Sequence, residues 1–223
     1  MTRHLALAAA VLAAAGAWAA APGGEDEKAG YAVGYRIGQG LKRDGLPLDP
    51  AAAAAGLRDA LEGKPPQVSG EEMGASLQVL QQRMAQRRAQ AAEDNAAAGK
   101  AFQEAFASKA GVTRLDNGLA WRVIKEGKGP TPGPQDTVVV HYRGRLVDGT
   151  EFDSSFRRGE PATFRLDQVI PGWQEALQRM PAGSEWEVVI PPELAYGARG
   201  AGNVIGPNAT LVFDIQLLEV KGR

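Results

Sequence analysis

The sequence predicts an α+β protein in two parts: an all-α N-terminal domain with a long linking helix, then a curved antiparallel β-sheet wrapped on a short helix. Up to about residue 110, apolar residues recur at helical spacing, and this part ends in a stretch of about 40 residues without proline. After Gly111, apolar and polar residues alternate in short runs between glycine- and proline-rich turns. We therefore expect a helical domain over residues 28–110 and a β-rich domain over residues 111–223.

Residues 1–21 have the pattern of a secretory signal peptide. Arg3 and His4 precede the almost wholly apolar run Leu5–Ala15, and Ala17-Trp18-Ala19 provides a small-x-small cleavage site. The run is shorter than the roughly 20 apolar residues that cross a bilayer, so no membrane span is expected. The alternative is an alanine-rich N-terminal helix of a cytosolic protein. The leader predicts export across the inner membrane to a periplasm, and it leaves an association with the outer membrane open.

The composition excludes several classes of site. The chain of 223 residues carries a formal net charge of -1, so no overall basic field favours binding to nucleic acid. It has no cysteine, which excludes disulfides, thiolate catalysis and zinc-thiolate centres. Of its two histidines, His4 belongs to the leader and His141 is expected to be structural or exposed. We therefore expect no metal site and no cofactor.

Three helices are expected in the N-terminal domain. The first carries apolar residues at roughly helical spacing, namely Tyr31, Tyr35, Ile37 and Leu41. Asp49 followed by Pro50 is typical of an N-cap and a first helical position, and it predicts a second helix that continues over Ala51–Leu61. Ser69 and Glu72 form a capping-box pattern, which predicts the start of the third helix.

The third helix is expected to extend from about Gly70 to Lys109. Its first part carries an apolar stripe, Met73, Leu77, Leu80 and Met84, which needs a partner surface. Its middle, Ala85–Lys100, has no large apolar residue and is expected to be an exposed rod, after which Phe102 and Phe106 provide a second docking point. A homodimer through the N-terminal helices would cover the stripe; a helical bundle within one chain is the alternative.

The β-rich domain is expected to contain strands over Gly118–Lys125, Thr137–Leu146, Glu185–Ile190 and Leu211–Val220. Asp167 is expected to cap a short helix that contains Gly172–Met180. A set of mostly aromatic and aliphatic residues in this domain contains no pair of nucleophile and base: Tyr142, Phe152, Asp153, Val169, Ile170, Trp173, Tyr196 and Phe213. Such a set suits a reaction that needs an apolar cavity, for example rotation about an X-Pro bond, whose barrier is about 18–20 kcal/mol.

Five motifs in this domain resemble the FKBP-type peptidyl-prolyl cis-trans isomerases over about residues 115–221. They are Val140-His141-Tyr142-Arg143-Gly144, Asp148-Gly149-Thr150-Glu151-Phe152-Asp153-Ser154-Ser155, Val169-Ile170-Pro171-Gly172-Trp173, Ala195-Tyr196-Gly197 and Ala209-Thr210-Leu211-Val212-Phe213-Asp214. The helical half is similar to the N-terminal dimerisation domain of the envelope subgroup, the macrophage-infectivity-potentiator-like isomerases. That likeness rests on Tyr31-Ala32-Val33-Gly34-Tyr35, the second helix and the long third helix.

The resemblance implies roles for ten residues. Trp173 would form the floor on which the proline ring lies, because an indole offers a wide apolar face. The walls would be Tyr142, Phe152, Val169, Ile170 and Phe213. The backbone N–H of Ile170 and the hydroxyl of Tyr196 would donate to carbonyl oxygens of the substrate. Asp153 would polarise the twisting amide or orient Tyr142, and Arg158 would pair with Asp153. Ile205 would provide an apolar contact.

The implied activity is isomerisation of X-Pro bonds in unfolded or partly folded exported polypeptides, with an accompanying chaperone activity. Macrolides such as tacrolimus are further candidate ligands. Their affinity would depend on Ala162, which replaces a phenylalanine frequent in the family, and on the glycine-rich loop 200–207. Two alternatives belong to other classes: a chaperone that uses the pocket only to hold proline-containing chains, and a peptide-docking module without turnover.

Overall fold

The computed structural model describes residues 23–222, which form two compact units that divide between Leu46 and Pro47. The expected signal peptide, residues 1–21, lies outside the described residues. The first unit contains helix α1, Glu25–Arg43. Its N-terminus is closed by the Glu27 carboxylate, which accepts a hydrogen bond from the N–H of Gly23 at 2.8 Å. Such a side chain satisfies a backbone N–H that the helix itself leaves free.

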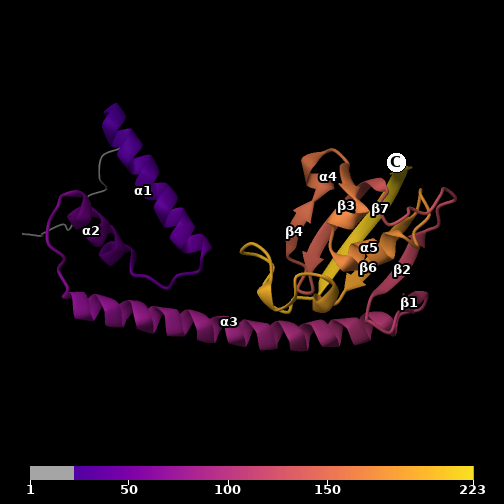
Figure 1. Cartoon of the computed structure of the whole chain (residues 1–223), viewed down its shortest axis with the longest axis horizontal. Helices are drawn as coiled ribbons and strands as arrows, with labels where there is room; N and C mark the ends of the chain where they lie inside the picture. Colours follow the sequence, from indigo (N-terminus) through magenta and orange to yellow (C-terminus); the bar gives the residue numbers. More distant parts are fainter. Residues whose placement is uncertain (1–22, 223) are drawn as a thin grey trace, which may run out of the picture. The chain divides into compact units, whose positions relative to one another are not determined.

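The second unit begins with helices α2, Pro50–Leu61, and α3, Gly70–Ala107 (Figure 1). Both expected N-caps are confirmed. Asp49 accepts from the N–H of Ala52 at 2.7 Å, while the N–H of Glu72 donates to Ser69 at 3.2 Å and the Glu72 carboxylate accepts from the N–H of Ser69 at 2.9 Å. Despite the length of α3, no helix among residues 23–222 is both long and apolar enough to cross a membrane.

A seven-stranded antiparallel sheet forms the rest of this unit and confirms the predicted fold class. The strands are β1 Val112–Arg114, β2 Ala120–Lys125, β3 Thr137–Leu146, β4 Glu151–Ser154, β5 Ala162–Arg165, β6 Glu185–Ile190 and β7 Leu211–Lys221. Their order is β1-β2-β6-β7-β3-β4, and β5 pairs with the first part of β3. Short helices join them: α4 Ser155–Arg158, η1 Leu166–Gln168, α5 Pro171–Leu177, η2 Pro192–Leu194 and η3 Gly197–Arg199.

Helix α5 packs on one face of the sheet, and the core lies between them (Figure 1). Trp173 and Leu177 of α5 belong to the same buried cluster as Val140 and Ile215 of the central strands β3 and β7. Gly172 allows this close approach, because a Cβ there would lie 2.3 Å from Cγ2 of Ile190.

The predicted cap of this short helix is wrong. The N-cap of α5 is Ile170, and Pro171 supplies the first helical residue. Asp167 lies instead in η1, where its carboxylate accepts from Arg165 at 2.5 Å. Proline fixes the backbone angle that begins a helix and has no N–H to satisfy, so a side-chain cap is less needed here.

The predicted docking of α3 is confirmed at its C-terminal end, where Phe106 is buried against Ala120, Val189 and Val212. The expectation that Ala85–Lys100 is an exposed rod is confirmed for most of its residues and is wrong on one side of the helix. Gly99 is buried and Asn95 is half-buried, because this part of α3 lies against the loop that precedes β7. A search for large apolar residues misses this contact, since it is made by small residues and polar side chains.

Candidate functional site

Trp173 lies at the centre of a group of aromatic rings. The rings of Tyr142, Phe164 and Phe213 have centroids 5.2 Å, 5.6 Å and 5.3 Å from that of Trp173, and their planes make angles of 88°, 87° and 81° with the indole. Three rings therefore stand nearly perpendicular to the indole plane, as walls do to a floor. Edge-to-face contacts of this kind are favourable, so they hold the indole in one orientation.

The indole lies buried in an apolar environment. Trp173 is 4% exposed, and its Nε1 is buried without a hydrogen-bond partner within residues 23–222. A buried N–H without a partner is rare in proteins, since water or another polar group usually satisfies it. The surroundings of the indole are therefore mostly apolar side chains.

The outer part of the ring cluster is formed by Phe152 of β4, whose centroid lies 5.6 Å from that of Phe213. Gly144 of β3 makes room for both rings, because a Cβ there would lie 2.6 Å from Phe152 and 2.8 Å from Phe213. Sequence reasoning missed Phe164. It follows Ala162 by two residues in β5, so the strand alternation places both side chains on the same face, and both pack on the central core.

The turn Val169–Ile170 is fixed in place by α5. The carbonyl of Ile170 accepts from the N–H groups of Trp173 and Gln174 at 3.0 Å and 3.1 Å, and the Gln174 side chain donates to the carbonyl of Val169 at 2.8 Å. The N–H of Ile170 donates to no acceptor within residues 23–222. A rigid turn thus presents one free donor beside the half-buried side chains of Val169 and Ile170.

Residues 197–210, which we call the flap, connect Tyr196 to strand β7. Ile205 of the flap is 9% exposed and belongs to the same apolar core cluster as Trp173. The flap is closed by a short bridge, in which Ala201 and Ile205 exchange backbone hydrogen bonds of 2.8 Å and 3.2 Å. Tyr196 is 40% exposed and lies outside the packed cluster, at the start of the flap.

A polar network borders the aromatic cluster on the β4 side. The hydroxyl of Tyr142 donates to Asp153, and Arg158 donates to both, at 2.5 Å to Asp153 and 3.0 Å to the Tyr142 hydroxyl. Burial acts to raise the pKa of the Asp153 carboxyl, but the hydrogen bonds from Tyr142 and Arg158 outweigh it and lower that pKa below its ordinary value. Burial, with help from Asp153, raises the pKa of Tyr142. At neutral pH the site therefore holds a neutral phenol and an ionised carboxylate.

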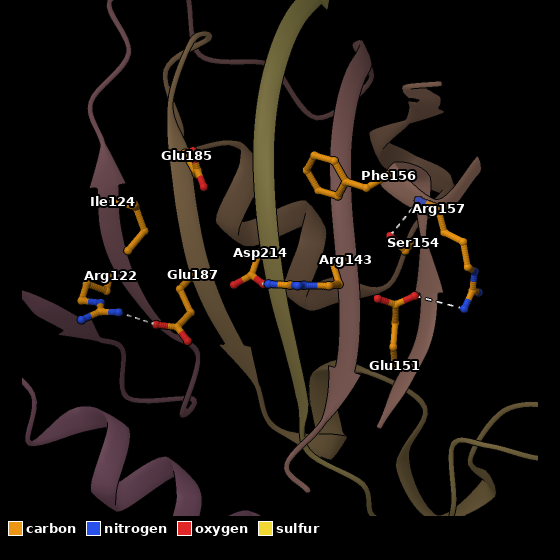
Figure 2. Close-up of a pocket in the computed structure, with 10 residues that line it drawn as sticks. All are labelled: Arg122, Ile124, Arg143, Glu151, Ser154, Phe156, Arg157, Glu185, Glu187 and Asp214. Atoms are coloured by element: carbon orange, nitrogen blue, oxygen red, sulfur yellow. Dashed lines mark hydrogen bonds and ion pairs between the residues drawn. The ribbon is translucent and has the colours of Figure 1, made fainter. Parts of the chain in front are cut away.

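The opposite face of the sheet carries a different hollow, of about 680 Å³ (Figure 2). Arg143 and Asp214 line it, and they alternate along β3 and β7 with Tyr142 and Phe213 of the aromatic cluster. Most of its side chains are charged and paired with one another, as Arg122 is with Glu187 at 2.9 Å. Phe156 alone among its lining residues is aromatic, whereas several rings surround Trp173, so we place the candidate site on the Trp173 face.

Comparisons with known proteins agree with this fold. The family model for FKBP-type peptidyl-prolyl cis-trans isomerases matches residues 129–218, and the model for the domain amino-terminal to these isomerases matches residues 26–123. The chain belongs to the FKBP-type peptidyl-prolyl cis-trans isomerase family. It is therefore an enzyme that acts on proline-containing polypeptides.

Relatives of this isomerase extend over most of its length. It is 48% identical to the "FKBP-type 22 kDa peptidyl-prolyl cis-trans isomerase" of Escherichia coli, over 87% of this chain and 95% of the relative. It is 46% identical to the "Outer membrane protein MIP" of Legionella longbeachae, over 88% of this chain and 86% of the relative. The crystal structure of FkpA from Escherichia coli matches with a TM-score of 0.64 and 42% identity, over 90% of this chain and 99% of that one.

The structure of the isomerase brings nine of the ten expected site residues together. Eight lie in or pack against the apolar core cluster around Trp173, or join its polar border: Tyr142, Phe152, Asp153, Arg158, Val169, Ile170, Ile205 and Phe213. Trp173 is the ninth, and Tyr196 stands apart from them. Two further residues near Trp173 were not predicted from the sequence. Phe164 could have been found from the alternation along its strand, whereas Gln174 reaches the carbonyl of Val169 only because the first turn of α5 brings the two together.

The titration of Asp153 tests the polar network. The lowered pKa means that this network stabilises the fold at pH values above the ordinary aspartate pKa of about 3.9, and that this contribution is lost as the pH falls through the lower pKa of the folded chain. Carboxyl NMR of the folded protein should give Asp153 a midpoint below about 3.9. Arg158→Met should raise it, and Arg158→Met with Tyr142→Phe should raise it further, because burial is then opposed only by the N–H of Ser154, which donates to Asp153 at 2.8 Å.

The carboxyl of Asp148 provides an internal reference for this titration. Its pKa is lowered by the N–H of Thr150, which donates at 2.9 Å, and neither substitution removes that donor. A midpoint for Asp153 that stays in place in both variants would contradict the network.

Proposed function

We propose that X-Pro isomerisation takes place at the Trp173 face, with the indole as the floor and Tyr142, Phe152, Phe164 and Phe213 as walls. The single observation that supports this most is the arrangement of three rings perpendicular to one buried indole, beside the free N–H of Ile170. A flat apolar face bordered by upright rings matches the shape and chemistry of a pyrrolidine ring.

The proposed mechanism needs no proton transfer. A planar amide is stabilised by charge separation between its oxygen and nitrogen, and the twisted amide is less polar. Transfer into a dry aromatic site therefore disfavours the planar amide more than the twisted one, and walls shaped to the twisted form add to this difference. If the site binds the twisted amide more tightly than the planar one by about 1.4 kcal/mol, the rate of isomerisation rises about tenfold. No covalent chemistry is needed.

The polar groups have positioning roles in this proposal. The N–H of Ile170 and the hydroxyl of Tyr196 donate to backbone carbonyls on the two sides of the proline. Asp153 and Arg158 orient the Tyr142 hydroxyl, and Val169 and Ile205 provide apolar contacts with the residue before proline. Tacrolimus-type macrolides would compete for the same face, at an affinity set by Ala162 and the flap.

We further propose that the substrates are exported polypeptides. The leader pattern of residues 1–21 supports a periplasmic enzyme, and one relative carries the name "Outer membrane protein MIP". Residues 28–110 would form a dimerisation domain and residues 111–223 the isomerase domain. Met73 and Leu77 of the apolar stripe are 41% and 55% exposed, which supports a second copy of the chain as the surface that covers them.

Two sites on one dimer would also favour chaperone activity. A non-native chain with several prolines binds both sites, and the second contact benefits from a high effective concentration. Catalysis and the binding of non-native chains would then use the same Trp173 face. Protection of these chains from aggregation would also depend on the dimer.

Refolding of a protein limited by prolyl isomerisation tests the proposed function. Uncatalysed isomerisation takes tens to hundreds of seconds, about the timescale of such a slow phase, and the full chain should accelerate it in proportion to its concentration. A chaperone that only binds would instead leave the phase unchanged or slow it. If the full chain accelerates neither the refolding phase nor the isomerisation of a short X-Pro peptide, the proposed catalysis is contradicted and a docking module is favoured.

A further inference from the structure

The flap is held from outside by the long helix. Arg88 of α3 donates through one nitrogen, Nη2, to the carbonyls of Ala198 and Arg199, at 3.3 Å and 2.8 Å. These carbonyls belong to the last residues of η3, where a helix leaves its carbonyl groups without partners. The Arg88 guanidinium provides hydrogen-bond donors for both of these carbonyls.

Further along α3, two amide side chains contact the second half of the flap. Asn95 donates to the carbonyl of Pro207 at 2.9 Å, and Gln103 donates to the hydroxyl of Thr210 at 2.8 Å. The surfaces are close enough that a Cβ on Gly99 would lie 2.4 Å from the Thr210 hydroxyl oxygen, and a Cβ on Gly206 2.7 Å from the Asn95 amide nitrogen.

These contacts come from one face of the helix. Arg88, Asn95, Gly99 and Gln103 follow one another at steps of seven, four and four residues, which returns to the same side of an α-helix each time. The flap is thus bound at its start and at two points of its second half by a single helix.

The flap also has backbone restraints of its own. Besides the Ala201–Ile205 bridge, the N–H of Asn208 donates to the carbonyl of Gly197 at 2.9 Å and the N–H of Gly200 donates to the carbonyl of Tyr196 at 3.2 Å, while Val204 at the tip is 49% exposed. The polar contacts from α3 lie on both sides of Ile205, which packs on the apolar core cluster that contains Trp173.

We propose that α3 is a positioning element of the isomerase site, in which Arg88 and Asn95 hold the flap in its substrate-binding conformation. The helix that bears the proposed dimer surface at one end thereby sets the affinity for substrate at the other. A flap that is already ordered loses less freedom when substrate binds, so its release weakens binding and leaves the floor intact. This inference rests on the proposed site at Trp173.

The test uses the full chain with Arg88→Met and Asn95→Asp together. The first change removes the guanidinium, and the second replaces an amide donor by a carboxylate of the same shape. The two changes remove three hydrogen bonds to the flap, and only part of their net free energy is coupled to substrate binding. We therefore expect the KM for an Ala-Leu-Pro-Phe peptide to rise about 3- to 10-fold, with kcat within about twofold. Amide hydrogen exchange at Ala201 and Ile205 should accelerate, while exchange in β3 stays unchanged.

The matched control is Arg87→Met with Gln86→Glu. It makes the same change of charge on α3, and within the described part of the chain neither side chain forms a hydrogen bond to the flap. Both kinetic constants and flap exchange should stay at wild-type values. Arg88→Lys with native Asn95 should keep most of the affinity, because an ammonium still donates to the two carbonyls.

Unchanged exchange at Ala201 and Ile205 in the folded double variant would overturn the inference, and so would faster exchange with an unchanged KM. The proposed site is judged separately, by turnover of a Trp173→Leu variant. If Trp173→Leu loses turnover but the α3 changes have no effect, only the proposed role of α3 is contradicted. If Trp173→Leu keeps full turnover, the proposed site itself is contradicted.

Discussion

Replacement of Trp173 by leucine is expected to lower kcat/KM for an Ala-Leu-Pro-Phe peptide at least tenfold, which corresponds to about 1.4 kcal/mol or more of lost transition-state stabilisation. The indole is the only group in the proposed site that offers a flat apolar face to the proline ring while three rings surround it. Leucine keeps the site apolar and partly filled, whereas alanine would add the cost of truncating a buried tryptophan, about 3–5 kcal/mol.

Trp186 provides a matched control for this prediction. It is also 4% exposed, its Nε1 also lacks a partner within residues 23–222, and it stacks on Trp121 at a centroid distance of 5.3 Å instead of bordering the proposed site. Trp186→Leu should destabilise the fold to a similar degree and leave kcat/KM of the folded protein within about threefold, since the transition-state contacts remain. Equal loss of activity in both variants would indicate that Trp173 acts only through the stability of the core.

Leu77→Glu with Met84→Glu is expected to convert the protein from dimer to monomer. Both residues lie on the apolar stripe of α3, seven residues apart, so the two new charges face the same partner surface. An unpaired carboxylate in an apolar interface is strongly unfavourable, and a pair of them outweighs what a stripe of this length contributes. Sedimentation equilibrium should give twice the chain mass for the wild type and the single chain mass for the variant.

The control for the dimer prediction is Gln78→Glu with Gln86→Glu, which adds the same charge to exposed positions on the other side of α3. It should remain a dimer. Peptide turnover should be equal in all three proteins, because each site lies within one chain, whereas protection of a large aggregating client should fall in the monomer. A wild-type protein that sediments as a monomer would end the proposal.

The comparison of sequence and structure shows which kinds of contact a pattern reveals. Strand β3 is predicted at its observed bounds, Thr137–Leu146, because its apolar residues alternate without interruption. The caps Asp49 and Ser69 are predicted because capping is local in the sequence. The roles proposed for Trp173 and Phe213 rest on resemblance, since their apolar pattern alone is that of any core residue.

What the sequence could not give depends on residues distant in the chain. Phe164 becomes a wall only through the pairing of β5 with β3, which brings it beside Tyr142 and Trp173. Arg88 and Asn95 have the composition of a solvated helix face, and their partners are backbone carbonyls, which no side-chain pattern marks. Asp167 was a plausible cap whose place was taken by Pro171.

The location of the proline ring tests the central claim most directly. Protein–peptide NOEs, measured with the Ala-Leu-Pro-Phe peptide bound to the full chain, report which side chains the ring contacts during exchange between its isomers. We predict cross-peaks from the proline δ and γ protons to the indole of Trp173 and to the rings of Tyr142 and Phe213. Cross-peaks to Ile124 and Phe156, on the charged hollow of the other face, with none to Trp173, would contradict it.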